Sequence, residues 1–206
     1  APEVMRWEEI SLPEPGPGEV QLRHTMVGLN FIDVNHRSGA YPLKLLPAVI
    51  GMEGAGIIET VGDGVVDFVE GDRVAYCMVL GAYAEHRIIA ADRLIPIGLE
   101  TTDEVAAAST LQGLTAHYLV HESWPVRNGD TVLVHAAAGG VGLLLCQWAK
   151  AKGATVIGTV GSEQKAAYVS DYGCDYPVVY TNEDFAKKVL ELTDQRGADV
   201  IYDVVG

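Results

Sequence analysis

The sequence predicts an α/β protein with a β-rich amino-terminal domain and a doubly wound parallel sheet in its carboxy-terminal domain. Two observations carry this prediction. Up to residue 97, short β-branched runs are separated by glycine and proline, which is typical of an antiparallel sheet. From Thr131 onward, strand-like and helical segments alternate, which indicates right-handed crossovers and a parallel sheet. We expect the two domains to cover residues 1–110 and 111–206.

Five segments of the amino-terminal domain have the alternation or β-branched composition of strands, whereas the prolines and glycines of residues 11–19 predict a loop. The expected strand regions are residues 4–10, 19–30, 54–62 and 71–80, and residues 83–97 are expected to hold a pair of strands.

The period of the apolar residues then changes to that of a helix, over residues 103–123. Thr101 and Glu104 have the spacing of a capping box at its start. Gly113 is a weak point within the helix, and Pro125 is expected to end it.

The carboxy-terminal domain continues as alternating strands and helices. We expect strands at residues 131–136, 155–159, 177–180 and 198–205, and helices at 141–152, 162–172 and 182–193, the last capped by Asn182. A doubly wound sheet of two halves has about six strands. Because only four are predicted, we expect the chain to be part of a longer protein.

Charge and composition exclude several classes of protein. A net charge of −14 argues against nucleic acid or an anionic membrane as partner, because both require a basic face. Cys77, Cys146 and Cys174 are widely separated and form no C-x-x-C motif, and Cys146 is expected to be a buried thiol. Without an apolar segment of membrane-spanning length or a secretory signal, a cytoplasmic protein is expected.

The strongest motif is the glycine turn of residues 134–142, "VHAAAGGVG", between a predicted strand and a predicted helix. Its fingerprint positions hold Ala137, Gly139 and Gly142, and the alanine is tolerable if its φ is negative. Strand, turn and helix N-terminus together predict a dinucleotide site. The similarly spaced "GMEGAG" at residues 51–56 runs into a strand, so it is interpreted as an ordinary turn.

The choice of dinucleotide depends on the end of the next strand. NAD sites usually carry an acidic residue there, but residues 158–162 contain none. If Ser162 caps the following helix, Lys165 lies in its first turn, where a cation opposes the helix dipole. A 2′-phosphate would favour these two residues, so the sequence predicts NADP. A solvated surface lysine is the alternative.

No metal site is predicted. His117 and His121 have the i, i+4 spacing that could bind zinc on one helical face, but a third ligand is not evident.

The chain resembles the quinone oxidoreductases, the zeta-crystallin-like, zinc-independent branch of the medium-chain dehydrogenase/reductase superfamily. The segments that carry the resemblance are residues 28–42, 51–56, 70–76, 81–98, 111–120, 134–166 and 199–206. It implies a GroES-like catalytic domain joined to a Rossmann domain, NADPH as hydride donor, and a homodimer. The zinc-dependent relatives carry cysteine where this chain has Asn30 and histidine where it has Met52, so the resemblance also implies a zinc-independent enzyme.

The resemblance also implies roles for individual residues. Asn30 and Tyr41 would be the catalytic residues. The expected cofactor-binding residues are Asn30, Phe31, Ile32, Asp33 and Tyr41 around the nicotinamide, Thr115 and Tyr118 nearby, Gly139, Gly140 and Val141 at the pyrophosphate, and Gly161, Ser162, Lys165 and Tyr180 around the 2′-phosphate. Alternatively, Phe31 and Ile32 are core residues, Asp33 caps a helix, and Tyr118 packs on its helix.

The function expected from these residues is NADPH-dependent hydride transfer to quinones or related electron-poor alkenes and enones, without zinc. Quinone and enone reduction are not separated by the sequence. A non-catalytic NADPH-binding protein of the same fold is the alternative from a different class.

Overall fold

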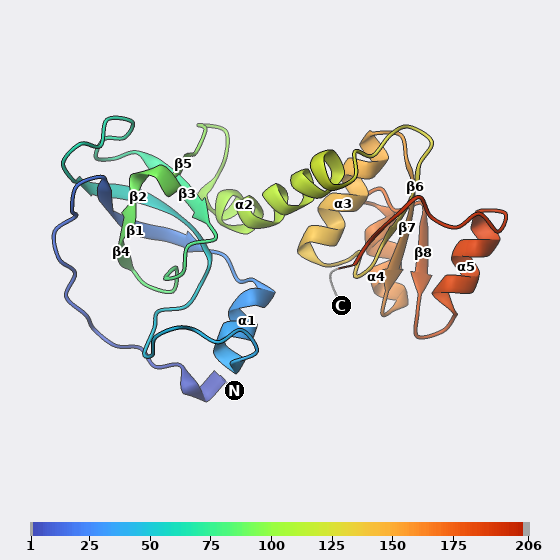
Figure 1. Ribbon diagram of the computed structural model, residues 1–206, viewed down its shortest axis with the longest axis horizontal. Helices are drawn as coiled ribbons and strands as arrows, with labels where there is room; N and C mark the ends of the chain where they lie inside the picture. Colours follow the sequence, from blue (N-terminus) through green and yellow to red (C-terminus); the bar gives the residue numbers. More distant parts are fainter. Residues whose placement is uncertain (1, 204–206) are drawn as a thin grey trace. The chain divides into compact units, whose positions relative to one another are not determined.

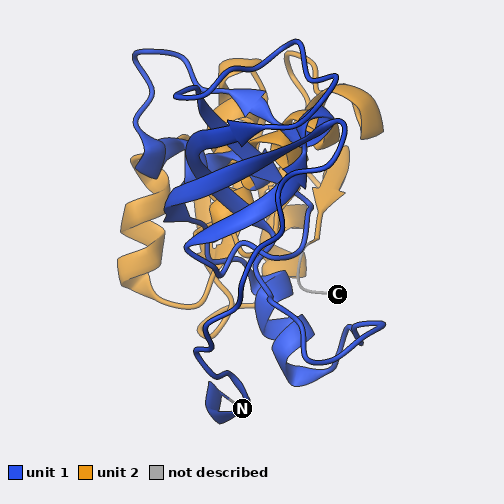
Figure 2. Cartoon of the chain, turned by 90° about the vertical axis from the view of Figure 1, so that its left-hand side faces the viewer, with its two compact units in different colours: residues 1–111 blue, residues 112–206 orange. Residues whose placement is uncertain are grey.

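The computed structural model describes residues 2–203, and the chain divides into two compact units, residues 1–111 and 112–206 (Figures 1 and 2). The division lies between Leu111 and Gln112, within helix α2 (Asp103–Tyr118). Each unit has its own sheet. Within the described residues, no helix is long and apolar enough to cross a bilayer.

The first unit is built on an antiparallel sheet of five strands in the order β4-β1-β2-β3-β5. One face buries Val20, Leu22 and Tyr76, and the other packs Ala55 and Ala75 against the start of α2. The strands are β1 (Glu19–Val27), β2 (Glu53–Val61), β3 (Arg73–Cys77), β4 (His86–Ala90) and β5 (Ile95–Pro96), and the helices are α1 (Phe31–Ser38) and the short η1 (Pro2–Val4) and η2 (Ala91–Arg93).

Two local predictions for this unit are wrong. Residues 4–10 form no strand, and only the short helix η1 lies at this end of the described chain. The start of α2 is capped by Thr102 rather than Thr101, because the Thr102 hydroxyl accepts a hydrogen bond from the Val105 N–H at 3.3 Å. The capping-box spacing had placed the helix start one residue too early.

The second unit is a parallel sheet with the strand order β8-β7-β6-β9. This is the first half of a doubly wound sheet and one further strand, as the alternation of the sequence predicted. The elements are the π-helical turn η3 (Leu119–Ser123), β6 (Thr131–Val134), α3 (Gly140–Ala151), β7 (Thr155–Val160), α4 (Glu163–Ser170), β8 (Tyr176–Val179), α5 (Phe185–Leu192) and β9 (Val200–Tyr202).

Both faces of this sheet are covered by helices (Figure 1). Val132 and Val134 point into a core with Leu145 and Cys146 of α3, which confirms the buried thiol. The intervening Leu133 points into a second core on the opposite face, which α5 covers. Because alternate side chains of a strand face opposite sides, burial on both faces explains why these strands are continuous apolar runs.

Of the two helix caps predicted for the second unit, one is confirmed and the other is wrong. Ser162 caps α4 as predicted, with its Oγ accepting from the Lys165 N–H at 3.3 Å. The cap of α5 is Asp184 rather than Asn182, because the Asp184 carboxylate accepts from two N–H groups of the first turn. The Asn182 amide instead donates to Glu163 at 3.1 Å.

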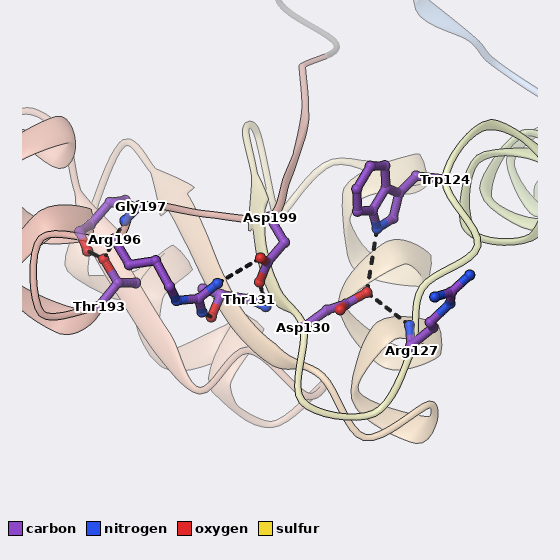
Figure 3. A network of polar contacts seen from close by, with 9 residues as sticks. Trp124, Arg127, Asp130, Thr131, Thr193, Arg196, Gly197 and Asp199 are labelled. Atoms are coloured by element: carbon purple, nitrogen blue, oxygen red, sulfur yellow. Dashed lines mark hydrogen bonds and ion pairs between the residues drawn. The ribbon is translucent and has the colours of Figure 1, made fainter.

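A polar network fixes the amino ends of β6 and β9 (Figure 3). The Asp199 carboxylate accepts from the Thr131 N–H at 2.7 Å and from the Arg196 guanidinium at 2.6 Å. Asp130 accepts from the Arg127 N–H and from the Trp124 indole. Since the strands are parallel, this network lies at the end of the sheet opposite their carboxyl ends.

Candidate functional site

A cavity of about 620 Å³ lies at the carboxyl ends of the parallel strands of the second unit. Open α/β sheets bind their ligands at this edge, and the volume suits a small-molecule site. Residues that follow each of the four strands contribute to it. The lining residues are His135, Ala136, Ala138, Gly139, Thr159, Val160, Gly161, Lys165, Tyr180, Phe185 and Asp203.

The glycine turn forms one wall of this cavity. Ala137 is buried and its φ is not positive, as the fingerprint with alanine in first place required. Ala136 adopts the left-handed conformation instead, with a φ of 49°. The Gly139 N–H donates to the Ala136 carbonyl at 2.8 Å, which closes the turn directly before α3.

Close packing explains why two positions of the turn are glycine. A Cβ on Gly142 would lie 2.4 Å from the Ala136 carbonyl oxygen, so this residue allows the close contact of helix and strand that the fingerprint predicts. A Cβ on Gly140 would overlap the Gln112 side chain, which lies over the turn. Gly139, at the N-cap of α3, leaves the helix N-terminus open to an anion.

The structure brings together the residues expected around a 2′-phosphate. Gly161, Lys165 and Tyr180 all line the cavity, and Ser162 follows Gly161 directly. Tyr180 lies over Gly161, because a Cβ there would be 2.9 Å from the tyrosine hydroxyl. Lys165 is exposed and takes part in none of the ion pairs found within residues 2–203. A cation without a counter-ion therefore faces the cavity.

Sequence reasoning missed His135, Thr159 and Phe185. The Nδ1 of His135 lies 2.9 Å from the Thr159 hydroxyl, and the histidine ring meets the Phe185 ring edge-on at 4.9 Å. His135 and Thr159 lie at the ends of adjacent parallel strands, and these positions could have identified them from the sequence. Phe185 comes from α5, and only the crossover brings it to the cavity.

In the first unit, Asn30 and Asp33 form a buried polar cluster at the start of α1. The Asn30 amide donates to Glu53 at 2.8 Å. The Asp33 carboxylate accepts from the Asn30 N–H at 2.9 Å and from the Tyr83 hydroxyl at 3.0 Å. Asp33 therefore caps the start of α1, as the alternative interpretation of this residue predicted. Glu53 also belongs to the cluster, and the sequence did not identify it.

The other expected site residues differ in exposure. Phe31 and Tyr41 are 79 % and 55 % exposed, so Phe31 is not a core residue of its unit, and Ile32 is half-buried. Thr115 and Tyr118 lie on α2, and neither is among the residues that line the cavity.

Metal ligands do not gather in the part of the chain that is described: within residues 2–203, no three His, Cys, Asp or Glu side chains could hold a metal ion. His117 and His121 stack on each other with ring centroids 4.3 Å apart, and both meet Trp148 edge-on. Zinc independence stays a prediction.

Two family models match the chain. Residues 16–100 match the alcohol dehydrogenase GroES-like domain, and residues 140–206 match a domain described as zinc-binding dehydrogenase. The chain is 48 % identical to a quinone oxidoreductase of Pseudomonas aeruginosa and 46 % identical to a 2-haloacrylate reductase of a Burkholderia species, over 100 % of its own length. It is 43 % identical to an Escherichia coli quinone oxidoreductase solved with NADPH, with a TM-score of 0.97 over the whole chain.

The chain spans 63 % of the length of each of these three proteins. The matches cover both units, and the antiparallel sheet followed by a parallel α/β sheet is the architecture that they share. The chain is thus similar to quinone oxidoreductases over both of its units.

Proposed function

We propose that the protein is an NADPH-dependent reductase that delivers hydride to quinones or to related electron-poor alkenes and enones, without zinc. One observation carries the cofactor choice. Lys165, Gly161 and Tyr180 line the cavity beside the glycine turn, and no acidic residue stands at the end of β7. An NAD site would place a carboxylate at this position to bind the ribose hydroxyls.

Backbone and side-chain groups of the second unit would bind NADPH. Gly139, Gly140 and Val141 offer the N-terminus of α3 to the pyrophosphate, because its first N–H groups have no partner within the helix. Ser162 and Lys165 would bind the 2′-phosphate through a hydroxyl and an ammonium group, with Tyr180 beside them. Bound NADPH supplies the hydride.

The acceptor class follows from the chemistry that the relatives' names have in common. Quinones and 2-haloacrylates both contain a C=C bond conjugated to an oxygen-bearing carbon, so hydride addition develops negative charge on oxygen. Polar groups near that oxygen stabilise it. We assign Asn30 and Tyr41 to this side of the site, and water as the source of the proton. We also propose a homodimer for the full natural protein.

Cofactor preference tests the first part of the proposal. Lys165→Ala should weaken NADPH binding about 10- to 100-fold, as expected for the loss of one charge-assisted hydrogen bond, and should leave NADH binding unchanged. Dissociation constants from fluorescence titration measure both. Lys165→Arg should retain most of the preference, and Lys187→Ala, an exposed lysine paired with Glu191 at 4.0 Å, is the matched control. Equal affinity of the unaltered protein for the two dinucleotides would refute the NADP assignment.

Turnover tests the second part. NADPH oxidation by the full natural protein should be followed against a panel of quinones, enones and haloacrylates, with Tyr41→Phe as the variant of the acceptor side. We expect turnover with at least one of these acceptors and a lower kcat in the variant. Tight NADPH binding without oxidation by any acceptor would favour the non-catalytic alternative, and stoichiometric zinc in an active preparation would contradict the zinc-free chemistry.

A further inference from the structure

Glu53 is a fully buried carboxylate beside Asn30, at 0 % exposure. We propose that Glu53 is a positioning residue, which holds the amide of Asn30 in a single orientation and thereby determines which polar groups Asn30 offers to the reacting molecules. The role of Asn30 rests on the proposed function, whereas the hydrogen bonds that hold it do not.

The carboxylate is held by donors from two separate segments. Its Oε2 accepts from the Asn30 amide at 2.8 Å, and its Oε1 accepts from the backbone N–H of Leu111, on α2, at 2.6 Å. Burial raises the pKa of the Glu53 carboxyl, and the hydrogen bonds from Asn30 and Leu111 oppose that rise. Charge-assisted hydrogen bonds of this kind are about twice as strong as neutral ones.

The carboxylate also fits closely into its surroundings. A Cβ on Gly28 would lie 2.5 Å from Oε2 of Glu53 and 2.4 Å from the carbonyl oxygen of Ala107. Gly28 lies two residues before Asn30, so the segment that carries Asn30 passes directly over Glu53. This close approach leaves the carboxylate little room to turn away from Asn30.

A carboxylate can only accept hydrogen bonds, so it selects one orientation of the Asn30 amide. The NH₂ end must face Glu53, because the reversed amide would place its carbonyl oxygen against a negative charge. The Asn30 backbone is held separately, by the hydrogen bond of its N–H to Asp33. Side chain and backbone of Asn30 are thus fixed by two different carboxylates.

Packing alone does not explain a carboxylate at this position. The backbone of Glu53 is already held by its pairing with Cys77 in the sheet and by the Gly28 N–H. An apolar side chain of similar volume would fill the site without the cost of desolvating a charge. What the Glu53 carboxylate adds to the fold is an acceptor for the Leu111 N–H and a fixed orientation of the Asn30 amide.

A double-mutant cycle on kcat separates positioning from folding. Glu53→Gln offers one acceptor and one donor, so it cannot accept from both Asn30 and Leu111. We expect it to lower kcat about 10- to 100-fold, because misplacing a positioning group by about 1 Å can cost up to about 100-fold in rate. In the Asn30→Ala background the same change should lower kcat less than about threefold, since a residue that acts through Asn30 has no effect without it.

The control is Glu59→Gln, a half-buried carboxylate on the same strand, paired with Arg23 at 3.0 Å, which should leave kcat unchanged. An unchanged kcat in Glu53→Gln, or an equal loss in both backgrounds, would overturn the proposal. Should Glu53→Gln fail to fold, Glu53→Asp serves in the same cycle, because it keeps the charge but retracts the oxygens by about one bond.

A measurement independent of activity keeps this proposal distinct from the proposed function. In isotope-labelled protein, the amide protons of the Asn30 side chain should give one downfield-shifted resonance in NMR spectra, which Glu53→Gln should move towards the values of exposed asparagines. If the unaltered protein reduces none of the acceptors but shows this resonance, the proposed function fails and the hydrogen bond stands. If the two side-chain protons of Asn30 resemble those of exposed asparagines, the positioning role is excluded.

Discussion

The two units build their candidate sites in different ways. In the second unit, the cavity is shaped mainly by backbone: a glycine turn, the open N-terminus of α3, the start of α4, and the carboxyl ends of four parallel strands. In the first unit, the Asn30 cluster is shaped by side chains: Glu53 and Tyr83 come from distant parts of the chain, and Asp33 lies on the helix that Asn30 precedes.

This difference explains why a motif could be found for one site and not for the other. A backbone site requires residues without bulk at fixed spacings, and such spacings are visible in a single sequence. A side-chain cluster requires partners that the fold brings together, such as Asn30 and Glu53, which are separated by 23 positions. Glu53 has no local pattern that marks it.

The largest expected effect is on the backbone-built site. Gly142→Ala places a Cβ 2.4 Å from the Ala136 carbonyl oxygen and 2.9 Å from the Ala137 Cα, so turn and helix must move apart. We expect the free energy of unfolding of the second unit to fall by about 3 kcal/mol, with weaker NADPH binding. Urea unfolding and hydrogen exchange resolved by unit measure this. Equal loss of protection in the first unit would contradict the separate construction of the two units.

The second effect is a pH dependence confined to the first unit. His24 is largely buried, and this burial lowers its pKa to about 4, with a hydrogen bond to the Ala84 carbonyl acting in the opposite direction. Because that carbonyl can only accept, the ring donates from Nδ1 and accepts from Tyr76 at Nε2, at 2.7 Å each. Burial therefore favours the neutral form of the ring in the folded unit.

The unfolded chain binds a proton on His24 below pH 6.5, whereas the folded unit does so only near pH 4. Stability from this residue is complete above pH 6.5 and is lost as the pH falls towards 4, by about 2–3 kcal/mol. Urea midpoints of the unaltered protein and of His24→Gln, compared from pH 7 to pH 4, measure the difference in slope. His86→Gln is the control, and identical slopes in all three would show that His24 is not held neutral.

A smaller effect is expected at the end of the second sheet that lies away from the cavity. Asp199→Asn weakens the hydrogen bonds to the Thr131 N–H and to Arg196, and should cost about 1–2 kcal/mol of stability. NADPH affinity should be unchanged, because this network fixes only the amino ends of β6 and β9. A loss of affinity with no loss of stability would mean that the two ends of the sheet are not independent.

The smallest effect has the opposite sign. Gly113 lies inside α2 with open space where a Cβ would be. Gly113→Ala should therefore raise stability by about 0.5–1 kcal/mol through helix propensity alone. It is also the matched control for Gly142→Ala, since both replace a helical glycine by alanine. A gain of stability in both variants would show that helix propensity, and not the contact with Ala136, dominates at these positions.

Most of the fold could be predicted because periodicity and local chemistry agree along the chain. The alternation after Thr131, the turn with Gly139 and Gly142, and the Ser162 cap all depend on neighbours within one turn or strand. Two of the errors occur where neighbouring residues compete for one local role. Thr101 and Thr102 are both good N-caps, as are Asn182 and Asp184, and only the hydrogen bonds of the folded chain decide between them.

The sequence by itself determined the two sheets, the glycine turn and the cation at the start of α4, because each depends on residue types and spacings within a short segment. Only the tertiary structure decided that Ala136 carries the positive φ, that Lys165 and Tyr180 face one cavity, and that Asp33 caps a helix. It also placed the buried carboxylate of Glu53 against Asn30. The reason is physical: a buried charge is tolerated only where donors from elsewhere in the chain converge on it, and that convergence exists only after folding.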